Sequence, residues 1–362
     1  MSELRWNPIL EEWVVTATHR QDRTYRPPEG FCPLCPTHDA ESPTEVPLPG
    51  YEIVVFENKF PSFRRAPGQP AVQGTDLQPV APPVGVCEVV LYTDDHHATF
   101  ADLPVERITN LVDVWTDRYE ELGALECVDY VLIFENKGDA VGVTLSHPHG
   151  QIYGFPFVPP RAAKELESAE RHLADTGRCL FCDLLSDELT DGRRMVAENA
   201  HFAAFIPFFA RYPYEVHVMP KQHRTCLPEL DASERRGFAE ILKAVTSGYD
   251  SLFGFSLPYI MVIHQAPTDR GEHSSSGTEC DSDGVCVTGS HYGHYHMHVE
   301  FYPPHRTANK VKYLAGCESG AGTFINDTLP EEKAVELREA VARAAAQARS
   351  GSGGGGINGH RA

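Results

Sequence analysis

Hydrophobic and polar positions follow the same order in the two halves of the chain. Apolar residues recur close to every 3.6 positions over residues 104–122 and again over 232–248, which predicts one amphipathic helix in each half. An apolar run rich in branched side chains follows each helix, at 130–136 and at 259–265, and predicts a strand. Each half therefore has the pattern strand, strand, helix, strand, and then a histidine-rich strand.

The repeat extends to short motifs. A C-x-x-C pair opens each half, at Cys32/Cys35 and at Cys179/Cys182. The remaining landmarks recur in the same order, 55–63 with 196–205, 88–103 with 215–230, and 146–155 with 294–303. Because five landmarks share one order, chance is a poor explanation, and we infer two related halves.

This order of elements predicts an α+β fold. Most connections within a half are short enough for hairpins, so we expect mainly antiparallel sheets with helices packed on one face. We place the N-terminal half at 1–160 and the C-terminal half at 161–345. The Gly/Ser-rich residues 346–362 predict a disordered tail, and the polar stretch 267–293 predicts a long surface loop.

Charge narrows the classes of function. The formal net charge of −20 argues against a protein that binds nucleic acid or a membrane surface, since both need a basic face. The sequence has no run of 18 apolar residues, so no membrane span is predicted, and the N-terminus lacks the apolar core of a signal peptide. We therefore expect a cytoplasmic protein, in which closely spaced cysteines bind metal more often than they form disulfides.

The segment H-P-H-G-Q carries the candidate chemistry. In a strand, His147, His149 and Gln151 would face one side, with Pro148 and Gly150 between them. A neutral imidazole is a nucleophile near pH 7 and can attack phosphorus, while the amide of Gln151 can donate to phosphoryl oxygens. An isolated H-x-H is more often a metal-binding or core feature, so the glycine, the glutamine and the neighbouring elements favour catalysis here.

HPHGQIYG (147–154) resembles the active-site signature of the galactose-1-phosphate uridylyltransferase family, in the histidine-triad superfamily. Four other segments resemble the same family, namely RWNPILEEWVVTATHR (5–20), IFENKG (133–138), EFYPP (300–304) and KVKYLAGCE (310–318). The resemblance spans about 5 to 345 and implies two histidine-triad-like halves in a homodimer.

The resemblance also implies a reaction in galactose metabolism. UDP-glucose would uridylylate His149 and release glucose 1-phosphate, and galactose 1-phosphate would then accept the uridylyl group, in a ping-pong sequence assisted by Gln151. The substrate-binding residues implied are Arg20, Arg23, Asn58, Phe60, Asn136, Thr144, Lys312, Tyr313 and Glu318. Lys59 stands where the family has an aspartate.

Three metal sites are expected. The resemblance implies a zinc site at Cys32, Cys35, His96 and His147, a donor set that suits tetrahedral Zn²⁺. It also implies a second site, for Zn²⁺ or Fe²⁺, at Glu165, His264, His298 and Glu300, where Glu300 replaces a family histidine. The internal repeat alone predicts a further zinc site at Cys179, Cys182, His223 and His294. The same alignment places His296 opposite the nucleophile and His298 opposite the glutamine, and we expect His296 to be structural.

Three alternatives remain open. A related nucleotide-sugar or dinucleotide phosphorylase, or an adenylyltransferase, would use the same histidine chemistry. A hydrolase is a second possibility, although Gln151 favours transfer. A non-catalytic zinc module that binds protein or nucleic acid is a third, and the acidic charge argues against it.

Overall fold

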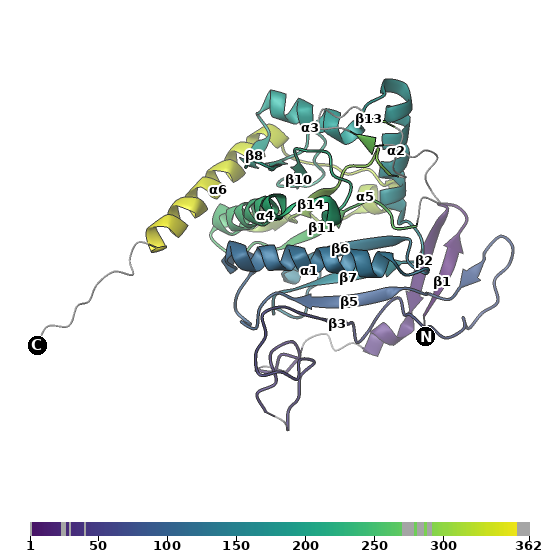
Figure 1. The fold of residues 1–362 in the computed structure, drawn as a ribbon. Coiled ribbons are helices and arrows are strands. Elements are labelled where there is room, and N and C mark those ends of the chain that lie inside the picture. The colour runs from purple at the N-terminus through teal and green to yellow at the C-terminus, as the bar shows by residue number, and fades with distance from the viewer. Residues whose placement is uncertain are drawn as a thin grey trace, which may run out of the picture.

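A single nine-stranded antiparallel sheet organises the molecule (Figure 1). The computed structural model describes residues 2–22, 27–28, 30–39, 41–269, 279–280, 286–287 and 292–352. The strand order is β3-β5-β7-β6-β11-β14-β10-β9-β8. Its bounds are β3 Val54–Glu57, β5 Val86–Leu91, β6 Tyr130–Lys137, β7 His149–Phe155, β8 Met195–Glu198, β9 Phe202–Phe205, β10 Val216–Pro220, β11 Tyr259–His264 and β14 His298–Tyr302.

The two related halves meet in the middle of this sheet. Strand β6 of the first half pairs antiparallel with β11 of the second, from Tyr259 opposite Lys137 to Ile263 opposite Ile133. On either side of this seam, β7, β5 and β3 occupy the places that β14, β10 and β9 occupy in the other half. The halves therefore form one continuous sheet, and apolar residues from both of them share one core.

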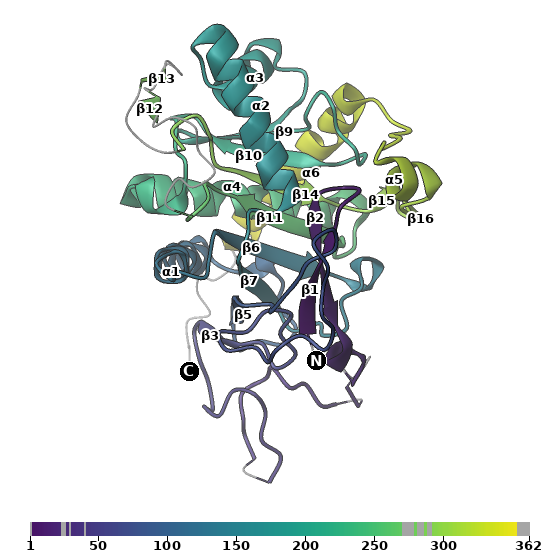
Figure 2. The same cartoon turned by 90° about the vertical axis from the view of Figure 1, so that its right-hand side faces the viewer.

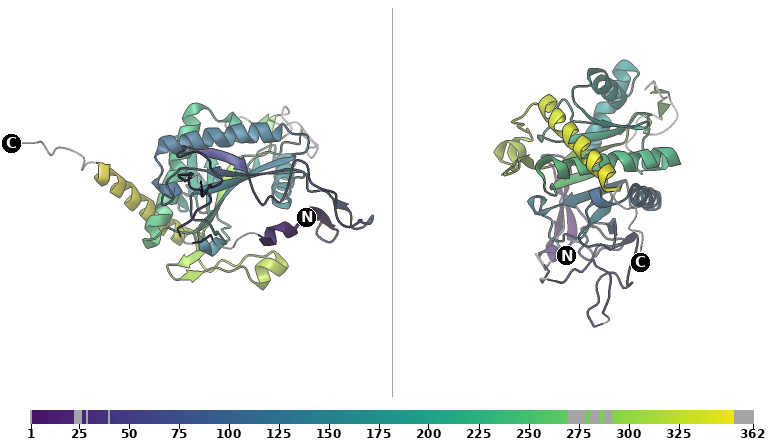
Figure 3. Two further views of the ribbon diagram at one scale, coloured as in Figure 1. Left: turned by 90° about the horizontal axis from the view of Figure 1, so that it is seen from below. Right: turned by 90° about the vertical axis from the view of Figure 1, so that its left-hand side faces the viewer.

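Helices cover one face of the sheet. Helix α1 (Val105–Gly123) and helix α4 (Ala232–Phe253) lie there, and α6 (Pro330–Ser352) crosses α4 on its outer side (Figure 3). Asp231 caps the N-terminus of α4, and its carboxylate accepts hydrogen bonds from the amides of Ser233 and Glu234. The apolar side of each helix packs on the sheet, as the 3.6-residue periodicity predicts.

The opposite face carries N-terminal segments and the first two helices of the C-terminal half. Strands β1 (Ser2–Asn7) and β2 (Glu12–Ala17) form a hairpin that lies across the sheet from α1 (Figure 2). The two helices are α2 (Pro160–Thr176) and α3 (Leu180–Asp191). The remaining elements are short: η1 Thr18–Asp22, β4 Val80–Ala81, η2 Phe100–Asp102, η3 Asp139–Val141, η4 Leu227–Glu229, β12 Glu279–Cys280, β13 Cys286–Val287, β15 His305–Thr307, β16 Lys310–Val311 and α5 Gly316–Ala321.

The C-terminal boundary differs from the sequence-based expectation. Helix α6 continues to Ser352, so residues 346–352 are helical, and the rest of the predicted tail lies outside the described residues. Alanine-rich sequence before the glycines has high helix propensity, which outweighs the weak amphipathic pattern there. Most of the predicted loop at 267–293 also lies outside the described residues. No helix in the described part of the chain is long and apolar enough to cross a membrane.

Candidate active site and metal clusters

Strand β7 presents the candidate catalytic residues. His149, Gln151 and Tyr153 are half-buried on one face of the strand, whereas Gly150 and Ile152 are buried on the helix-covered face. A Cβ atom at Gly150 would lie 2.1 Å from Tyr92 Oη, so only glycine fits this close approach. The strand begins at His149, after Pro148. His147 therefore lies outside it and is buried, unlike the shared strand face that the sequence pattern predicted.

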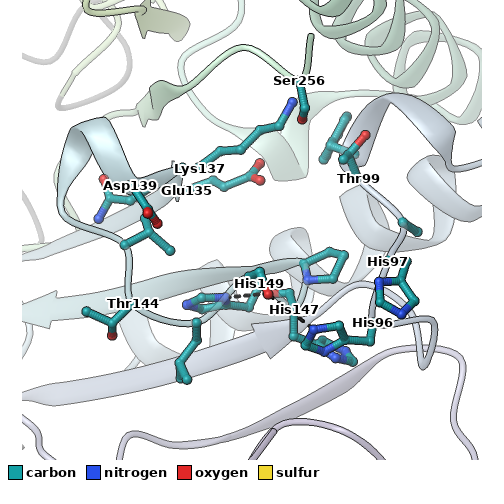
Figure 4. A pocket seen from close by; sticks show the side chains of 18 of the residues that line it. His96, His97, Thr99, Glu135, Lys137, Asp139, Thr144, His147, His149 and Ser256 are labelled. Atoms are coloured by element: carbon teal, nitrogen blue, oxygen red, sulfur yellow. Dashed lines mark hydrogen bonds between the residues drawn. The ribbon is translucent and has the colours of Figure 1, made fainter. Parts of the chain in front are cut away.

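Backbone hydrogen bonding fixes the ring of His149. Its Nδ1 lies 2.7 Å from the carbonyl oxygen of His147, a contact drawn in Figure 4. Because a carbonyl oxygen can only accept, Nδ1 carries the proton and donates, and the lone pair of the neutral ring lies on Nε2. This is the tautomer that an imidazole nucleophile needs, with the reactive nitrogen on the side away from the backbone.

A tyrosine orients the amide of Gln151. Tyr153 Oη donates to Gln151 Oε1 at 3.3 Å. Burial raises the pKa of Tyr153, so its hydroxyl keeps its proton and remains a donor. With Oε1 accepting this hydrogen bond, the NH₂ group of Gln151 is the part of the amide that can donate to a bound phosphoryl oxygen.

Two cavities meet at His149. One of about 570 Å³ has several polar residues in its lining, among them Glu135, Asn136, Lys137, Asp139 and Ser256; Figure 4 shows Lys137 and Glu135 across it from His149. The other, of about 290 Å³, contains three phenylalanines and two amides: Phe31, Phe56, Phe60, Asn58 and Gln151. Thr144, Leu145 and His149 line both cavities, so the histidine stands at their junction.

The predicted substrate residues fall into two groups. Asn136 and Thr144 line the larger cavity, and Asn58, Phe60 and Thr144 line the smaller one. Four others line neither. Arg20 donates to Ser62 at 2.5 Å, Lys312 pairs with Glu318 at 2.8 Å, and Tyr313 is 77% exposed. Arg23 lies outside the described residues.

Sequence reasoning missed three residues of the site. Glu135 and Lys137 flank Asn136 and line the larger cavity, where Lys137 pairs with Asp250 at 2.8 Å. Burial outweighs the attraction of Lys137 and raises the pKa of Glu135 to about 7. Tyr153, which orients Gln151, is the third. All three lie within the IFENKG and HPHGQIYG segments. Tyr153 is two residues from Gln151, the spacing of side chains on one face of a strand, and this signal could have identified it.

The first C-x-x-C pair meets two histidines beside the active site. Cys35 Sγ lies 3.4 Å from His96 Nδ1 and 3.6 Å from His147 Nδ1, and the ligand atoms of these residues and Cys32 lie within 4.8 Å of one another. His147 Nε2 donates to the carbonyl oxygen of Thr93 at 2.8 Å, which leaves Nδ1 as the nitrogen for a metal. Two thiols and two imidazoles at this spacing fit a tetrahedral, zinc-class ion.

An acidic histidine cluster lies on the other half of the sheet. Glu165, His264, His298 and Glu300 bring their ligand atoms within 4.8 Å of one another. Burial lowers the pKa of His264, but Glu165 and Glu300 outweigh it and raise the value to about 9. Glu300 also pairs with Arg161 at 3.0 Å and with Arg211 at 3.4 Å. The set can hold a metal, and the two arginines compete with that metal for Glu300.

The second C-x-x-C pair also meets two histidines, and one of them corrects the sequence alignment. Cys182 Sγ lies 3.3 Å from His223 Nδ1 and 3.4 Å from His296 Nδ1, so His296, rather than His294, joins Cys179 in this cluster.

The register of the repeat is therefore two residues away from the one inferred by sequence. His298 Nδ1 contacts the carbonyl oxygen of His296 at 3.0 Å, as His149 contacts that of His147. His298 thus occupies the nucleophile's place in the second half, and Glu300 occupies that of Gln151.

Comparison with known proteins identifies the family. Models of the galactose-1-phosphate uridyl transferase N-terminal and C-terminal domains match residues 1–159 and 165–349. The galactose-1-phosphate uridylyltransferase of Thermotoga maritima is 40% identical over 341 residues, which cover 94% of this chain and 98% of that protein. The one from Streptomyces lividans is 37% identical, with 87% of each chain covered. A solved uridylyltransferase structure is 33% identical, with a TM-score of 0.78 and coverage of 94% of this chain and 99% of that one.

These matches extend over both halves and confirm the family resemblance and the α+β fold with mainly antiparallel strands. They favour uridylyl transfer over the phosphorylase, hydrolase and non-catalytic alternatives. The chain therefore belongs to the galactose-1-phosphate uridylyltransferase family and transfers uridylyl groups between UDP-glucose and hexose 1-phosphates in galactose metabolism.

Proposed function

We propose that His149 carries the uridylyl group between two half-reactions. Nε2 attacks the α-phosphorus of UDP-glucose, and the bond from that phosphorus to the bridging oxygen breaks, which releases glucose 1-phosphate. A phosphate oxygen of galactose 1-phosphate then attacks the same phosphorus, the N–P bond breaks, and UDP-galactose leaves. The observation that carries this proposal is the Nδ1 hydrogen bond to the His147 carbonyl oxygen, which directs the lone pair to Nε2.

The NH₂ group of Gln151 stabilises charge on the transferring phosphoryl group. Its donors act where negative charge is greatest in the transition state, so they lower the barrier more than they strengthen ground-state binding. Thr144 lines both cavities and adds a hydroxyl at their junction.

The two cavities divide the substrate between them. The smaller one combines aromatic rings with Asn58 and suits the uridine, whose base can pack on Phe60. The larger one has cationic and amide groups, Lys137 and Asn136, and suits the hexose phosphate that leaves and enters. Arg20 and Arg23 are assigned to the nucleotide phosphates on the family resemblance alone.

The remaining predicted substrate residues belong to a homodimer contact in this proposal. Lys312, Tyr313 and Glu318 line neither cavity of their own chain. The side chains of Lys312 and Glu318 are buried and pair with each other at 2.8 Å, so they support the segment that presents the exposed Tyr313 to a partner copy. A native particle with the mass of a monomer in light scattering would contradict this assignment.

Two metals belong to the proposal. Zn²⁺ would be held by Cys32, Cys35, His96 and His147 as a structural ion that fixes the segment before His149. Glu165, His264, His298 and Glu300 would hold Zn²⁺ or Fe²⁺. We place the enzyme in the cytoplasm, where a reducing environment keeps such thiols available to metal.

Intact-protein mass spectrometry after mixing with UDP-glucose alone tests the nucleophile. The native chain should gain the mass of one uridylyl group. His149→Ala should gain none while still binding UDP-glucose, because only the covalent step is lost. His97→Ala is the matched control, since His97 lines the same cavity without belonging to β7, and it should keep the adduct. A uridylyl adduct that persists in His149→Ala would show that another residue is the nucleophile.

A further inference from the structure

The second C-x-x-C pair belongs to a buried four-residue cluster far from His149 along the chain. Cys179, His223 and His296 are buried, and Cys182 is half-buried. All four ligand atoms lie within 4.8 Å of one another. The chemistry of uridylyl transfer uses none of these residues, so the cluster requires a separate explanation.

Its geometry repeats that of the first cluster atom for atom. In each, the second cysteine faces the Nδ1 atoms of two histidines: Cys35 at 3.4 and 3.6 Å, and Cys182 at 3.3 and 3.4 Å.

The histidines also come from matching places in the sheet. His96 and His223 follow β5 and β10, which are equivalent strands, while His147 and His296 lie two residues before the first residues of β7 and β14.

The side chains of this cluster are arranged as an ion would need them. Cys182 Sγ faces His223 Nδ1 and His296 Nδ1, while the two Nε2 atoms are buried with no hydrogen-bond partner among the described residues. The two cysteines form no disulfide, although their sulfur atoms are close together. An ion bound through the two Nδ1 atoms and two thiolates would leave the proton of each neutral ring on Nε2.

We propose that Cys179, Cys182, His223 and His296 hold a second structural, zinc-class metal ion. Two thiolates and two imidazoles are the soft, four-donor set typical of tetrahedral Zn²⁺, and four protein ligands leave no position for substrate. Each cysteine that binds as a thiolate releases its proton to solvent. The site does not depend on the identity of the nucleophile.

The ion would fasten helix α3 to the C-terminal half of the sheet. Cys179 precedes α3 and Cys182 lies in its first turn, whereas His223 and His296 belong to the segments beside β10 and β14. Helix α2 precedes α3 in the chain and carries Glu165 to within 3.1 Å of His264. By holding α3, the metal therefore also holds α2 in the position that completes the acidic histidine cluster.

Metal content and Co²⁺ spectroscopy of the full chain test this site. The purified protein, stripped of metal and titrated with Co²⁺, should develop thiolate-to-cobalt absorption that grows through two equivalents. Cys32→Ser/Cys35→Ser and Cys179→Ser/Cys182→Ser should each lose one thiolate-bound equivalent, and the combined variant should lose both. Ions at Glu165 and His264 do not contribute to this signal, because that cluster has no thiolate.

Cys226→Ser is the control, since this half-buried cysteine lies outside both clusters, and it should keep both equivalents. If the Cys179→Ser/Cys182→Ser chain does not fold, the Cys32→Ser/Cys35→Ser chain tests the site instead. It keeps Cys179 and Cys182 and should therefore retain one thiolate-bound ion. Saturation of the native chain at one equivalent would overturn the proposal, as would an undiminished signal after Cys179→Ser/Cys182→Ser.

Discussion

At the residue scale, carbonyl oxygens decide which nitrogen of each histidine does the chemistry. His147 donates through Nε2 to Thr93 and turns Nδ1 to the cysteines, whereas His149 donates through Nδ1 and keeps its lone pair on Nε2. Neighbouring imidazoles in one short segment therefore have opposite tautomers and separate tasks. The sequence predicted the pair but not this division, because each tautomer depends on a carbonyl acceptor, supplied by Thr93 after β5 in one case and by His147 in the other.

Tyr153 is a positioning residue for Gln151, and its removal should lower kcat. Tyr153→Phe loses one hydrogen bond, worth about 1 kcal/mol or roughly a fivefold change. Gln151→Ala should reduce kcat by about 10²-fold, with little change in KM. Steady-state kinetics with UDP-glucose and galactose 1-phosphate measure both effects. If Tyr153 acts through Gln151, adding Tyr153→Phe to Gln151→Ala should cost nothing further, and an additive loss would contradict this role.

Glu135 should make the stability of the protein depend on pH. Its pKa is about 7 in the folded chain, against an ordinary value of 4.5, because it is buried. The unfolded chain ionises first as pH rises, so stability falls between about pH 4.5 and 7 and stays low above that range. Glu135→Gln should therefore stabilise the protein at pH 8 by roughly 1–3 kcal/mol and have almost no effect at pH 4.5. Urea unfolding at the two pH values measures the difference, and equal effects at both would contradict the assignment.

At the element scale, β7 can approach its neighbours closely because the residues on its buried face, Gly150, Ile152 and Gly154, are small or branched. Gly150 leaves room for Tyr92 from the segment after β5, and Gly154 packs close to Val128. Strand β7 pairs with both β5 and β6 over most of its length, so the nucleophile is carried by a central strand. This rigidity suits a group that must meet two substrates in turn.

Gly150→Ala should destabilise the protein, and a change in Tyr92 should relieve the effect. The new methyl group would meet Tyr92 Oη at 2.1 Å, and overpacking of this kind costs about 1–3 kcal/mol. Tyr92→Phe removes the hydroxyl, which is buried without a partner in the described chain, and should be near neutral alone. In urea unfolding, the double variant should be more stable than Gly150→Ala. If it is not, backbone strain rather than the hydroxyl contact limits this position.

Elements were more predictable than registers. Periodicity located α1, α4, β6 and β11 to within a few residues, because helix and strand spacing leave a direct trace in the apolar pattern. The histidine strand of the second half was misaligned because His294, His296 and His298 are spaced by two. A shift of the alignment by two residues therefore matches histidine with histidine again and keeps every ring on the same side of the strand. The backbone contact of His298, the sulfur contact of His296 and the first residue of β14 distinguish the two registers.

At the scale of the whole molecule, the two halves share an architecture but not a task. The first half places a histidine and a glutamine at the junction of two cavities, whereas the second places His298 and Glu300 in a closed cluster with two arginines. The sequence predicted two related halves and their motifs. It could not predict that Tyr313 would line neither cavity, because that placement depends on long-range packing that leaves no periodic pattern.

The seam between β6 and β11 has a consequence for how such a molecule could be divided. Each half supplies one strand to the seam, so a half made alone would expose that strand along its whole length as an unpaired edge. An exposed edge with an apolar face is a template for association with another chain. Residues 1–159 alone would satisfy the donors and acceptors of β6 most simply by pairing with a second copy of β6. The two halves of this chain are thus arranged like the two subunits of a dimer that are joined in one chain, and because each half has its own sequence, their sites can differ.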